Sequence, residues 1–468
     1  MSVLSHNMET AELFASHLAG LQDTMTQGLT SVKPGADAVL IHSGSLHYHF
    51  ADDIAKPFRA WGHFLQWVPV DRPDQFLLFR PGQKPVYFAV IPQDFWHDSH
   101  IDMPEWWAEQ FEIVVLSSVS ALCEQLPRHI APQCVCHFLG EGRDIAESLA
   151  IPDSQINPKT LLDWLDYARA YKSRYEISRL AEANATALAG HQAALDMFLM
   201  GGDEYEIHMA YLNASRICDD ELPYPSIVAL NEHSAILHYQ HKQRRHGKRE
   251  PDANRVLLID AGHRSWGYCS DITRTWVRPG SHPVFAALVK GVERIQNQII
   301  RSLQTEQSYT DHHHATHTAV ADLLIETGIA KGHAQDLVDR GITYAFLPHG
   351  LGHHLGLQVH DVGGKLSSPA GQIIPPPDQY PALRNTRPIE ANMVFTIEPG
   401  IYFIDSLLNN IRQDDRANAL NWPLVEALMP YGGIRIEDNI WAKPDGKMHN
   451  LTRRPVTGSL LFRPDVAA

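Results

Sequence analysis

The stretch RVLLIDAGHRSWGYCSDITRTWV, residues 255–277, carries the pattern on which the fold prediction depends. It begins with an apolar run that ends in Asp260, and eleven residues later Asp271 opens a second strand-like segment, DITRTWV. A strand period of two places Thr273 and Thr275 on the same face as Asp271. The two carboxylates can therefore lie opposite each other on adjacent strands, where a half-buried strand usually carries hydrophobic side chains.

Two later strand-like segments also carry a carboxylate where a hydrophobic side chain is expected. Glu398 ends the apolar run of VFTIEPG, and Glu437 lies between isoleucines in GGIRIEDN, with Arg435 on the same face. An isolated buried carboxylate costs several kcal/mol, so four carboxylates in apolar strands require cations.

Histidines gather in the segment PHGLGHHLGLQVHDVGG, which contains His349, His353, His354 and His360. Its glycines allow tight turns and close approach of the backbone. Four carboxylates and one neutral imidazole suit two divalent ions, Mn²⁺, Co²⁺ or Zn²⁺, better than a thiolate site would. Bridging carboxylates hold such ions about 3.5 Å apart, where a water between them becomes a hydroxide nucleophile near neutral pH. The pattern therefore predicts a hydrolase.

The order of the segments predicts two domains in this chain of 468 residues. Residues 1–158 predict an α/β domain, residues 159–180 a linker helix, and residues 181–468 an α+β catalytic domain with helices between early and late strands. The strands expected in the first domain lie at 38–44, 64–70, 75–79, 85–91 and 111–117. Those expected in the second lie at 255–260, 270–277, 393–403 and 432–442, with helices near 283–304, 311–327 and 333–340.

Composition excludes several functional classes. The chain has 39 Lys+Arg against 54 Asp+Glu, a net charge of −15, so we expect no binding to nucleic acid or to an anionic membrane surface. Five scattered cysteines do not form a disulfide framework and favour a reducing compartment. No window reaches the ~18 apolar residues of a spanning helix, and the N-terminus lacks the pattern of a signal peptide. We expect a soluble, cytoplasmic protein.

The ordered segments LIDAG, SDITRT, HGLGHHLGLQVHDVGG, FTIEPGIYF and GGIRIEDN resemble the metallopeptidase family built on the pita-bread fold. That family includes prolidases, aminopeptidase P, methionine aminopeptidase and creatinase. Within it, the chain is most similar to bacterial Xaa-Pro dipeptidases, some of which are also called organophosphorus acid anhydrolases. DFWH (94–97), PSIVALNEHSAILHY (225–239) and YFIDSLL (402–408) extend the resemblance over nearly the whole chain. It implies a pita-bread catalytic domain behind the N-terminal α/β domain.

The resemblance implies a dinuclear centre with two ions per subunit, most suitably Mn²⁺, with Co²⁺ or Zn²⁺ as alternatives. Asp260 would chelate one ion, and Asp271 and Glu437 would bridge the two. His353 and Glu398 would complete the shell of the second ion. Glu398 would also be the acid/base, taking a proton from the bridging water and passing it to the leaving proline nitrogen.

Substrate contacts also follow from the resemblance. His360 and His238 would hydrogen-bond the carbonyl oxygen or the tetrahedral intermediate. Arg384, in LRNTR, matches the position that binds the proline carboxylate. A guanidinium fork is well suited to bind a carboxylate. Arg435 would orient Glu437 or its neighbours.

Four further residues are assigned to substrate binding. Tyr224, in LPYPS, and Tyr309 match pocket tyrosines of the dipeptidase subgroup, and His349 is placed near the substrate rather than among the metal ligands. Asp53, in ADDIAKPF, matches an acidic residue that a partner subunit inserts near the substrate amine. The resemblance therefore implies a homodimer.

The leading hypothesis is an Xaa-Pro dipeptidase that cleaves dipeptides with a C-terminal proline, using a metal-bridging hydroxide as nucleophile. Hydrolysis of phosphotriesters or P–F bonds at the same site is expected as a side activity, and such hydrolysis as the main activity is an alternative. A metal-free binding protein on the pita-bread fold is a second alternative, and a creatine-type hydrolase is a third. All five ligand positions are filled, which disfavours these last two.

Three other features have simpler interpretations. The run DHHHATH (311–317) begins a helical pattern and predicts a solvated helix face rather than a metal site. The basic run KQRRHGKREP (242–251) predicts a solvated loop. Cys134, Cys136 and His137 lie in an apolar, strand-like run and are expected in the core.

Overall fold

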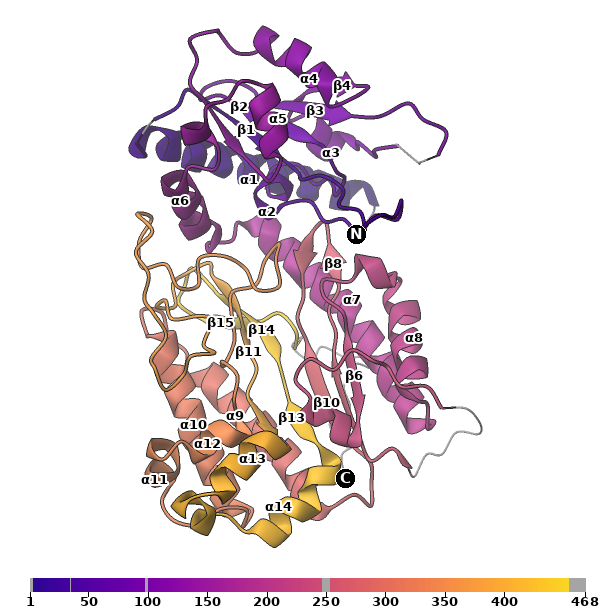
Figure 1. Ribbon diagram of the computed structural model, residues 1–468, viewed down its shortest axis with the longest axis vertical. Coiled ribbons are helices and arrows are strands. Elements are labelled where there is room, and N and C mark those ends of the chain that lie inside the picture. The colour runs from indigo at the N-terminus through magenta and orange to yellow at the C-terminus, as the bar shows by residue number, and fades with distance from the viewer. Residues whose placement is uncertain (1–2, 34, 97–99, 246–252, 454–468) are drawn as a thin grey trace. The chain divides into compact units, whose positions relative to one another are not determined.

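The computed structural model describes residues 3–33, 35–96, 100–245 and 253–453 (Figure 1). His97 of the DFWH segment and residues 246–251 of the basic run lie outside the described residues. The chain divides into two compact units, Met1–Ser178 with Leu366–Ile373, and Arg179–Lys365 with Ile374–Ala468. Among the helices that the structure describes, none has the length and apolar character needed to cross a bilayer.

A five-stranded sheet forms the centre of the N-terminal unit, in the order β4-β3-β2-β1-β5. Its strands are β1 (Ala38–His42), β2 (Phe76–Phe79), β3 (Val86–Val90), β4 (Glu112–Leu116) and β5 (Cys136–Leu139). β1 pairs in parallel with β5, and β3 pairs in parallel with β4, whereas β2 is antiparallel to both of its neighbours. Every residue of β1, β2, β3 and β5 is buried, as in a sheet covered on both faces.

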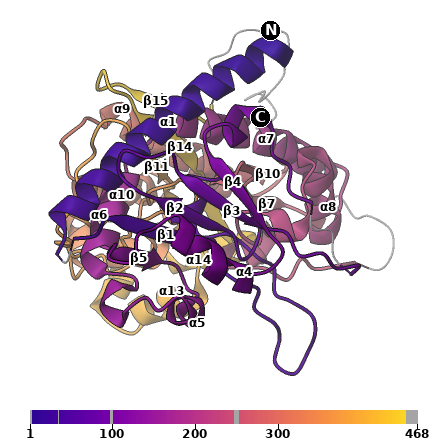
Figure 2. The ribbon, with the colours of Figure 1, turned by 90° about the horizontal axis from the view of Figure 1, so that it is seen from above.

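Helices surround this sheet, and the long α1 runs alongside it (Figure 2). They are α1 (Val3–Ser31), α2 (Gly62–Leu65), α3 (Glu105–Ala108), α4 (Ser120–Gln125), α5 (Arg143–Ser148) and α6 (Lys159–Arg169). Leu122 of α4 and Ala146 of α5 join the sheet residues Leu40, Phe76 and Phe138 in one hydrophobic cluster. The unit is therefore an α/β domain, as the sequence predicts.

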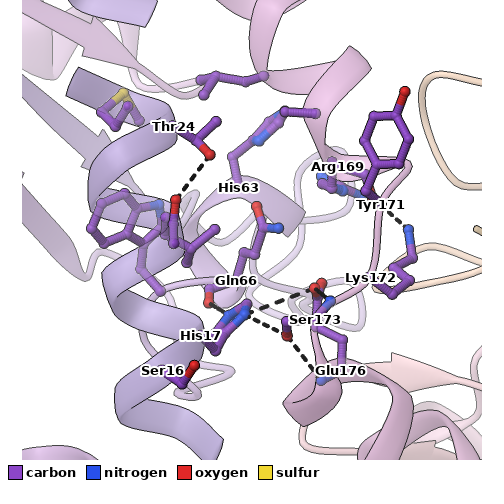
Figure 3. Close-up of a pocket in the computed structure, with 16 residues that line it drawn as sticks. Ser16, His17, Thr24, His63, Gln66, Arg169, Tyr171, Lys172, Ser173 and Glu176 are labelled. Atoms are coloured by element: carbon purple, nitrogen blue, oxygen red, sulfur yellow. Dashed lines mark hydrogen bonds and ion pairs between the residues drawn. The ribbon is translucent and has the colours of Figure 1, made fainter. Parts of the chain in front are cut away.

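A cavity of about 320 Å³ lies inside the N-terminal unit, beside α1, α2 and α6 (Figure 3). His17 in its wall donates from Nε2 to the carbonyl of Gln66 at 2.8 Å, and its Nδ1 accepts from the Ser173 hydroxyl at 2.8 Å. The Ser173 amide in turn donates to Glu176 at 2.7 Å. The polar wall is thus engaged in holding α1 to the segment that follows α6.

Two local predictions for the first 200 residues are wrong. The run 64–70, expected as a strand, belongs instead to α2 and the turn after it, where the amide of Gln66 donates to Gly62 at 3.0 Å. A short apolar run without alternation does not distinguish a buried strand from a buried helix. The helical run after residue 159 also breaks earlier than expected, between Arg169 and Arg174. Gly190 lies inside the next helix, where the Tyr211 ring leaves no room for a Cβ.

The C-terminal unit contains four small sheets, in the orders β10-β7-β6, β11-β14-β15, β12-β13 and β8-β9. The strands of its first half are β6 (Ile227–Leu230), β7 (Val256–Asp260), β8 (Arg264–Ser265), β9 (Tyr268–Cys269) and β10 (Thr273–Val277). Those of its second half are β11 (Val394–Ile397), β12 (Gly400–Tyr402), β13 (Gly433–Arg435), β14 (Asp438–Ala442) and β15 (Met448–Asn450). A bridge between Thr273 and Glu437 joins the two halves, so strands far apart in sequence lie side by side (Figure 1).

Each of the two late strands expected from the sequence is divided in two. The segment 393–403 forms β11 and β12, and the segment 432–442 forms β13 and β14. The antiparallel ladder is interrupted at the same place in both segments, next to Glu398 and Glu437. The predicted α+β class is confirmed, and the interruption marks where the ligand candidates lie.

The helices of this unit are α7 (Arg174–Leu199), α8 (Glu204–Ser215), α9 (Pro283–Ser302), α10 (Tyr309–Glu326), α11 (Ala334–Asp339), α12 (Ile342–Phe346), α13 (Asp405–Arg412) and α14 (Trp422–Leu428). Local signals explain several of their starts. A capping box of Asp203 and Glu206 begins α8, proline at the first position begins α9, and the Ser308 hydroxyl caps α10. α7 and α8 pack on β6 and β7, and α9 contacts β10, β12 and β13.

The histidine-rich run at the start of α10 is buried, so the predicted solvated face is wrong. His312, His313 and His317 are 7%, 2% and 1% exposed. The ring centroids of His313 and His317 lie 4.5 Å and 4.8 Å from that of Tyr380. Burial lowers the pKa of His313 to about 2 and that of His317 to about 4. These histidines are neutral and pack as aromatic core residues. In β5, Cys136 and His137 are buried as expected.

The segment that carries His353 lies beside β11, like an irregular added strand. The Thr396 amide donates to the carbonyl of His353 at 2.9 Å, and the Glu398 amide donates to that of Leu351 at 2.8 Å. Gly352 lies between them, where a Cβ would stand 2.1 Å from the Thr396 carbonyl and 2.3 Å from the Tyr309 hydroxyl. Any side chain at this position would push the segment off the strand.

We therefore expect Gly352→Ala to destabilise the C-terminal unit by about 1–3 kcal/mol, the usual cost of overpacking. Gly20→Ala in α1 is the control, because no atom lies within 4 Å of its added Cβ and alanine favours a helix. Thermal unfolding followed by circular dichroism should show a lower midpoint than the parent for Gly352→Ala and no decrease in the midpoint for Gly20→Ala. Equal midpoints for Gly352→Ala and the parent would contradict the close approach.

Candidate metal centre

Acidic residues at the ends of several strands converge in the C-terminal unit. Asp260 is the last residue of β7 and pairs with Thr273, the first residue of β10. Glu398 directly follows β11, and Glu437 directly precedes β14. The Thr273 hydroxyl donates to Glu437 Oε2 at 2.8 Å. Thr273 therefore connects the early strands to the late ones, and Asp271 lies two residues before it.

Asp271, His353 and Glu437 form the tightest group, with one ligand atom of each lying within 4.8 Å of the others. His353 Nδ1 donates to the carbonyl of His354 at 3.0 Å, so its Nε2 lone pair is directed into the site. Nε2 lies 3.3 Å from Asp271 Oδ2 and 3.6 Å from Glu398 Oε1. A lone pair that faces two carboxylates needs a proton or a metal ion between them.

Tyr224 and Arg435 contact the aspartates from the protein side. The Tyr224 hydroxyl lies 2.7 Å from Asp260 Oδ1 and 2.6 Å from Asp271 Oδ1, although one O–H can donate to only one acceptor at a time. Arg435 donates to Asp260 Oδ2 at 2.5 Å and to the Thr273 hydroxyl at 3.0 Å. Arg435 therefore contacts Asp260 directly and is linked to Glu437 through the Thr273 hydroxyl.

The charges at the centre do not balance without a cation. Arg435 and a protonated His353 would supply two positive charges beside the three buried carboxylates and the partly buried Glu398, and burial raises the pKa of Asp260 to about 6 and that of Glu398 to about 7. Burial and the neighbouring carboxylates raise the pKa of Glu437 well above its ordinary value. Burial also acts to raise the pKa of Asp271, but its hydrogen bond to His353 and the histidine's charge outweigh it and lower that pKa.

The hydrogen bonding of Glu437 Oε1 also fits a cation at this centre. This oxygen is buried and has no hydrogen-bond partner among the described residues. A buried carboxylate oxygen without a donor is costly, and a metal ion would satisfy it. The oxygen-rich donor set with one imidazole fits divalent cations such as Mn²⁺, Co²⁺ or Zn²⁺.

His349 lies beside Glu398 in a short hydrogen-bond chain. Its Nδ1 donates to the Gly350 carbonyl at 2.8 Å, and its Nε2 accepts from the Tyr402 hydroxyl at 3.1 Å. Tyr402 accepts from Arg435 at 2.7 Å. Burial, then the charge of Arg435, lowers the pKa of His349 to about 3. Both ring nitrogens are therefore engaged, and His349 is a neutral neighbour of Glu398 rather than an open substrate contact.

The side of the centre beyond His353 carries exposed cationic and imidazole groups. The ring centroid of His360 lies 4.4 Å from that of His353. Desolvation, then the charges of His353 and Arg384, lowers the pKa of His360 to about 4, and His238 contributes in the same direction. His360, His238 and Arg384 are all exposed, so these three candidates lie near one another on an accessible side of the site.

Two other candidates do not belong to this accessible side. Tyr309 is fully buried, and its hydroxyl donates to the Thr396 carbonyl at 2.6 Å. It therefore supports the segment that carries His353, instead of the substrate pocket that the resemblance implies. Asp53 is exposed in the loop between β1 and α2 of the N-terminal unit.

Buried polar residues behind the ligand candidates are not among those predicted from the sequence. Asn439 accepts from the Asp271 amide at 3.1 Å and donates to the Asp271 carbonyl at 2.5 Å. Arg274 donates to the Glu437 carbonyl at 2.7 Å, and Gln296 donates to two further carbonyls of these strands. Each of the three interrupts an apolar strand or helix pattern, which is the signal that could have identified them.

Family models match both parts of the chain. The model of metallopeptidase family M24 matches residues 178–444, and the model of the Xaa-Pro dipeptidase N-terminal domain matches residues 12–167. A protein of Shewanella woodyi named Xaa-Pro dipeptidase is 42% identical over 447 residues, which cover 95% of this chain and 98% of that protein. One of Pseudoalteromonas haloplanktis with the same name is 42% identical over 446 residues, with the same coverage of both chains.

Solved structures of aminopeptidases share the fold. Proline aminopeptidase P II from Yersinia pestis matches with a TM-score of 0.72 and 23% identity, over 96% of this chain and 98% of that one. Aminopeptidase P from Escherichia coli with the inhibitor Pro-Leu matches with a TM-score of 0.70 and 22% identity, over 93% and 94% of the two chains. The resemblance recognised in the sequence is thereby confirmed. The chain belongs to metallopeptidase family M24, as a two-domain enzyme with an N-terminal α/β domain and a C-terminal pita-bread domain.

Proposed function

We propose that the protein is an Xaa-Pro dipeptidase, which hydrolyses dipeptides that end in proline. The convergence of Asp271, Glu437 and His353, with Asp260 and the partly buried Glu398 beside them, carries the proposal, because it occurs in a chain that is 42% identical, over 95% of its length, to a protein named Xaa-Pro dipeptidase. The exposed Arg384 and His360 near this centre suit a short substrate with a free carboxylate.

Two divalent ions would be held by the five ligand candidates Asp260, Asp271, His353, Glu398 and Glu437. Asp260 would bind one ion, Asp271 and Glu437 would contribute to both, and His353 with Glu398 would complete the coordination of the other ion. Bound there, the ions would polarise the scissile carbonyl and lower the pKa of a water molecule to near neutrality. Mn²⁺ is our first choice, and Co²⁺ or Zn²⁺ suit the same donors.

Glu398 would move the proton during hydrolysis. It would take a proton from the attacking water and deliver it to the proline nitrogen, which must be protonated to leave as an amine. Its position between His353 and His349, with carboxylate oxygens 3.6 Å from each imidazole, supports this role.

Three residues on the accessible side would bind the substrate. His360 and His238 would donate hydrogen bonds to the carbonyl oxygen as negative charge develops there. Arg384 would pair with the proline carboxylate and so set the length of the substrate. Tyr224 would line the pocket beside the aspartates, which its hydroxyl contacts.

We also propose a homodimer in which Asp53 of each subunit reaches the substrate amine in the other. The carboxylate is exposed on an N-terminal loop and so is available to a partner. A cytoplasmic enzyme is consistent with five free cysteines, which suit a reducing compartment. A phosphotriester or P–F substrate would be a side activity, because a tetrahedral phosphorus centre mimics the intermediate of peptide hydrolysis.

Removal of the metal tests the proposed chemistry. Chelator-treated protein should lose activity toward Gly-Pro and Ala-Pro and regain it with Mn²⁺, because the carboxylates alone supply no electrophile. A proline-containing tripeptide should be a poor substrate, and a phosphotriester should be cleaved more slowly than the dipeptides. Dipeptide cleavage that survives complete metal removal would refute the proposal, and a phosphotriester cleaved faster than either dipeptide would favour the organophosphorus alternative.

Glu398→Gln tests the proton-transfer role. We expect turnover of Gly-Pro to fall by about 10²–10⁴-fold, the usual contribution of general acid–base catalysis. Glu326→Gln is a matched control, since this exposed glutamate pairs with Arg294 on the surface at 2.6 Å. Metal content should be measured in each variant, because Glu398 is also a ligand candidate. A Glu398→Gln enzyme with two bound ions and a near-normal rate would remove the residue from this role.

Complementation tests the partner's contribution. Asp53→Asn and Glu398→Gln should each be poorly active as pure proteins. In a mixed dimer, however, the Asp53→Asn subunit keeps its own Glu398 and receives Asp53 from its partner. Random mixing should therefore restore about a quarter of the parent activity, because half of the dimers are mixed and each has one complete site. Failure of the mixture to exceed either variant would place Asp53 outside the partner's site.

A further inference from the structure

Gln296 of α9 is a buried polar residue on the side of the helix that faces the metal centre. It has no exposed surface. Its Nε2 donates to the carbonyl of Ile397 at 3.0 Å and to that of Ile436 at 3.1 Å. Its Oε1 accepts from Arg453 at 3.0 Å. The amide thus uses both of its N–H donors on two strands that are far apart in sequence.

The two carbonyls belong to the residues immediately before Glu398 and Glu437. The ladder between the late strands is interrupted here, since β11 and β14 pair as far as Ile397 and Asp438, and β12 and β13 resume at Gly400 and Arg435. Regular strand pairing therefore does not set the separation of the two glutamates. Gln296 spans this interruption from the helix side.

Arg453 fixes which way the Gln296 amide points. Its Nε donates to Asp438 at 2.7 Å, and another of its nitrogens donates to Glu293 at 2.9 Å. An arginine can only donate, so the atom of Gln296 that faces it must be the oxygen. The amide nitrogen then faces the two carbonyls, and an oxygen in its place would repel them.

We propose that Gln296 is a positioning residue that sets the spacing of Glu398 and Glu437 and thereby the affinity of the centre for its metal ions. This inference rests on the proposed function, which takes both glutamates as ligands. Fixing each carbonyl fixes the peptide plane before the glutamate, and so the direction in which its side chain leaves the strand. Loss of residues that orient metal ligands typically weakens metal binding by about 10–100-fold.

Two variants separate this role from simple packing. Gln296→Met has a similar length but donates nothing to the carbonyls. Gln296→Glu keeps the shape and an acceptor for Arg453, but it replaces the donating nitrogen by an oxygen. Gln298→Met is the matched control, because Gln298 lies on the same helix and is exposed. Circular dichroism would report whether each metal-free variant folds.

The readout is metal affinity, measured by titrating metal-free protein with Mn²⁺ in competition with a chromogenic chelator. We expect the parent and Gln298→Met to bind two ions alike, and Gln296→Met and Gln296→Glu to bind at least one ion about 10–100-fold more weakly. With Mn²⁺ saturating, kcat for Gly-Pro should recover more fully than at limiting Mn²⁺.

Each other outcome overturns a defined statement. Parent-like affinity in a folded Gln296 variant, or an equal loss in Gln298→Met, overturns the positioning role. Failure of both Gln296 variants to fold also overturns it, because the residue is then needed for the core. A parent protein that binds no ions instead overturns the ligand set of the proposed function.

Discussion

Mutual repulsion among three buried carboxylates and the partly buried Glu398 is the constraint on which the C-terminal unit depends. Strand pairing brings Asp260, Asp271 and Glu437 together, and the single guanidinium of Arg435 offsets only part of their charge. Backbone and side-chain hydrogen bonds therefore hold acidic groups at positions where hydrophobic contacts alone would place none. Bound cations would offset the cost of this arrangement to the stability of the domain.

The candidate ligand residues could be proposed from the sequence because their signal is local. A carboxylate that ends or interrupts an apolar run stands out in the sequence, and four such carboxylates with one histidine-rich segment identify a family. The division of both late strands was not predictable, since an apolar run such as VFTIEPGIYF continues through the point where the pairing stops. Only the partner strands, brought in from other parts of the chain, determine where a ladder is interrupted.

Burial of polar residues was the second limit of sequence-based prediction. The histidines of α10 were expected in solvent because histidine is usually at least partly exposed, yet α9, α11 and α12 pack around that helix. Gln296 and Asn439 were overlooked for a related reason. Their importance depends on which carbonyl groups face them, and no spacing in the sequence reports that. Conversely, α2 replaced a predicted strand because an apolar run of seven residues fits either structure.

The bridge between Thr273 and Glu437 has a consequence for the order in which the protein is made. Glu437 is added to the chain 177 residues after Asp260, which at ~5–20 residues per second is an interval of about 10–35 s. During that interval β6, β7 and β10 can pair, but they present the two aspartates without Glu437. A growing chain therefore has only part of the proposed metal centre, and its affinity for divalent ions should be low. With the proposed ligand set, the complete metal site would therefore form only after the late strands dock.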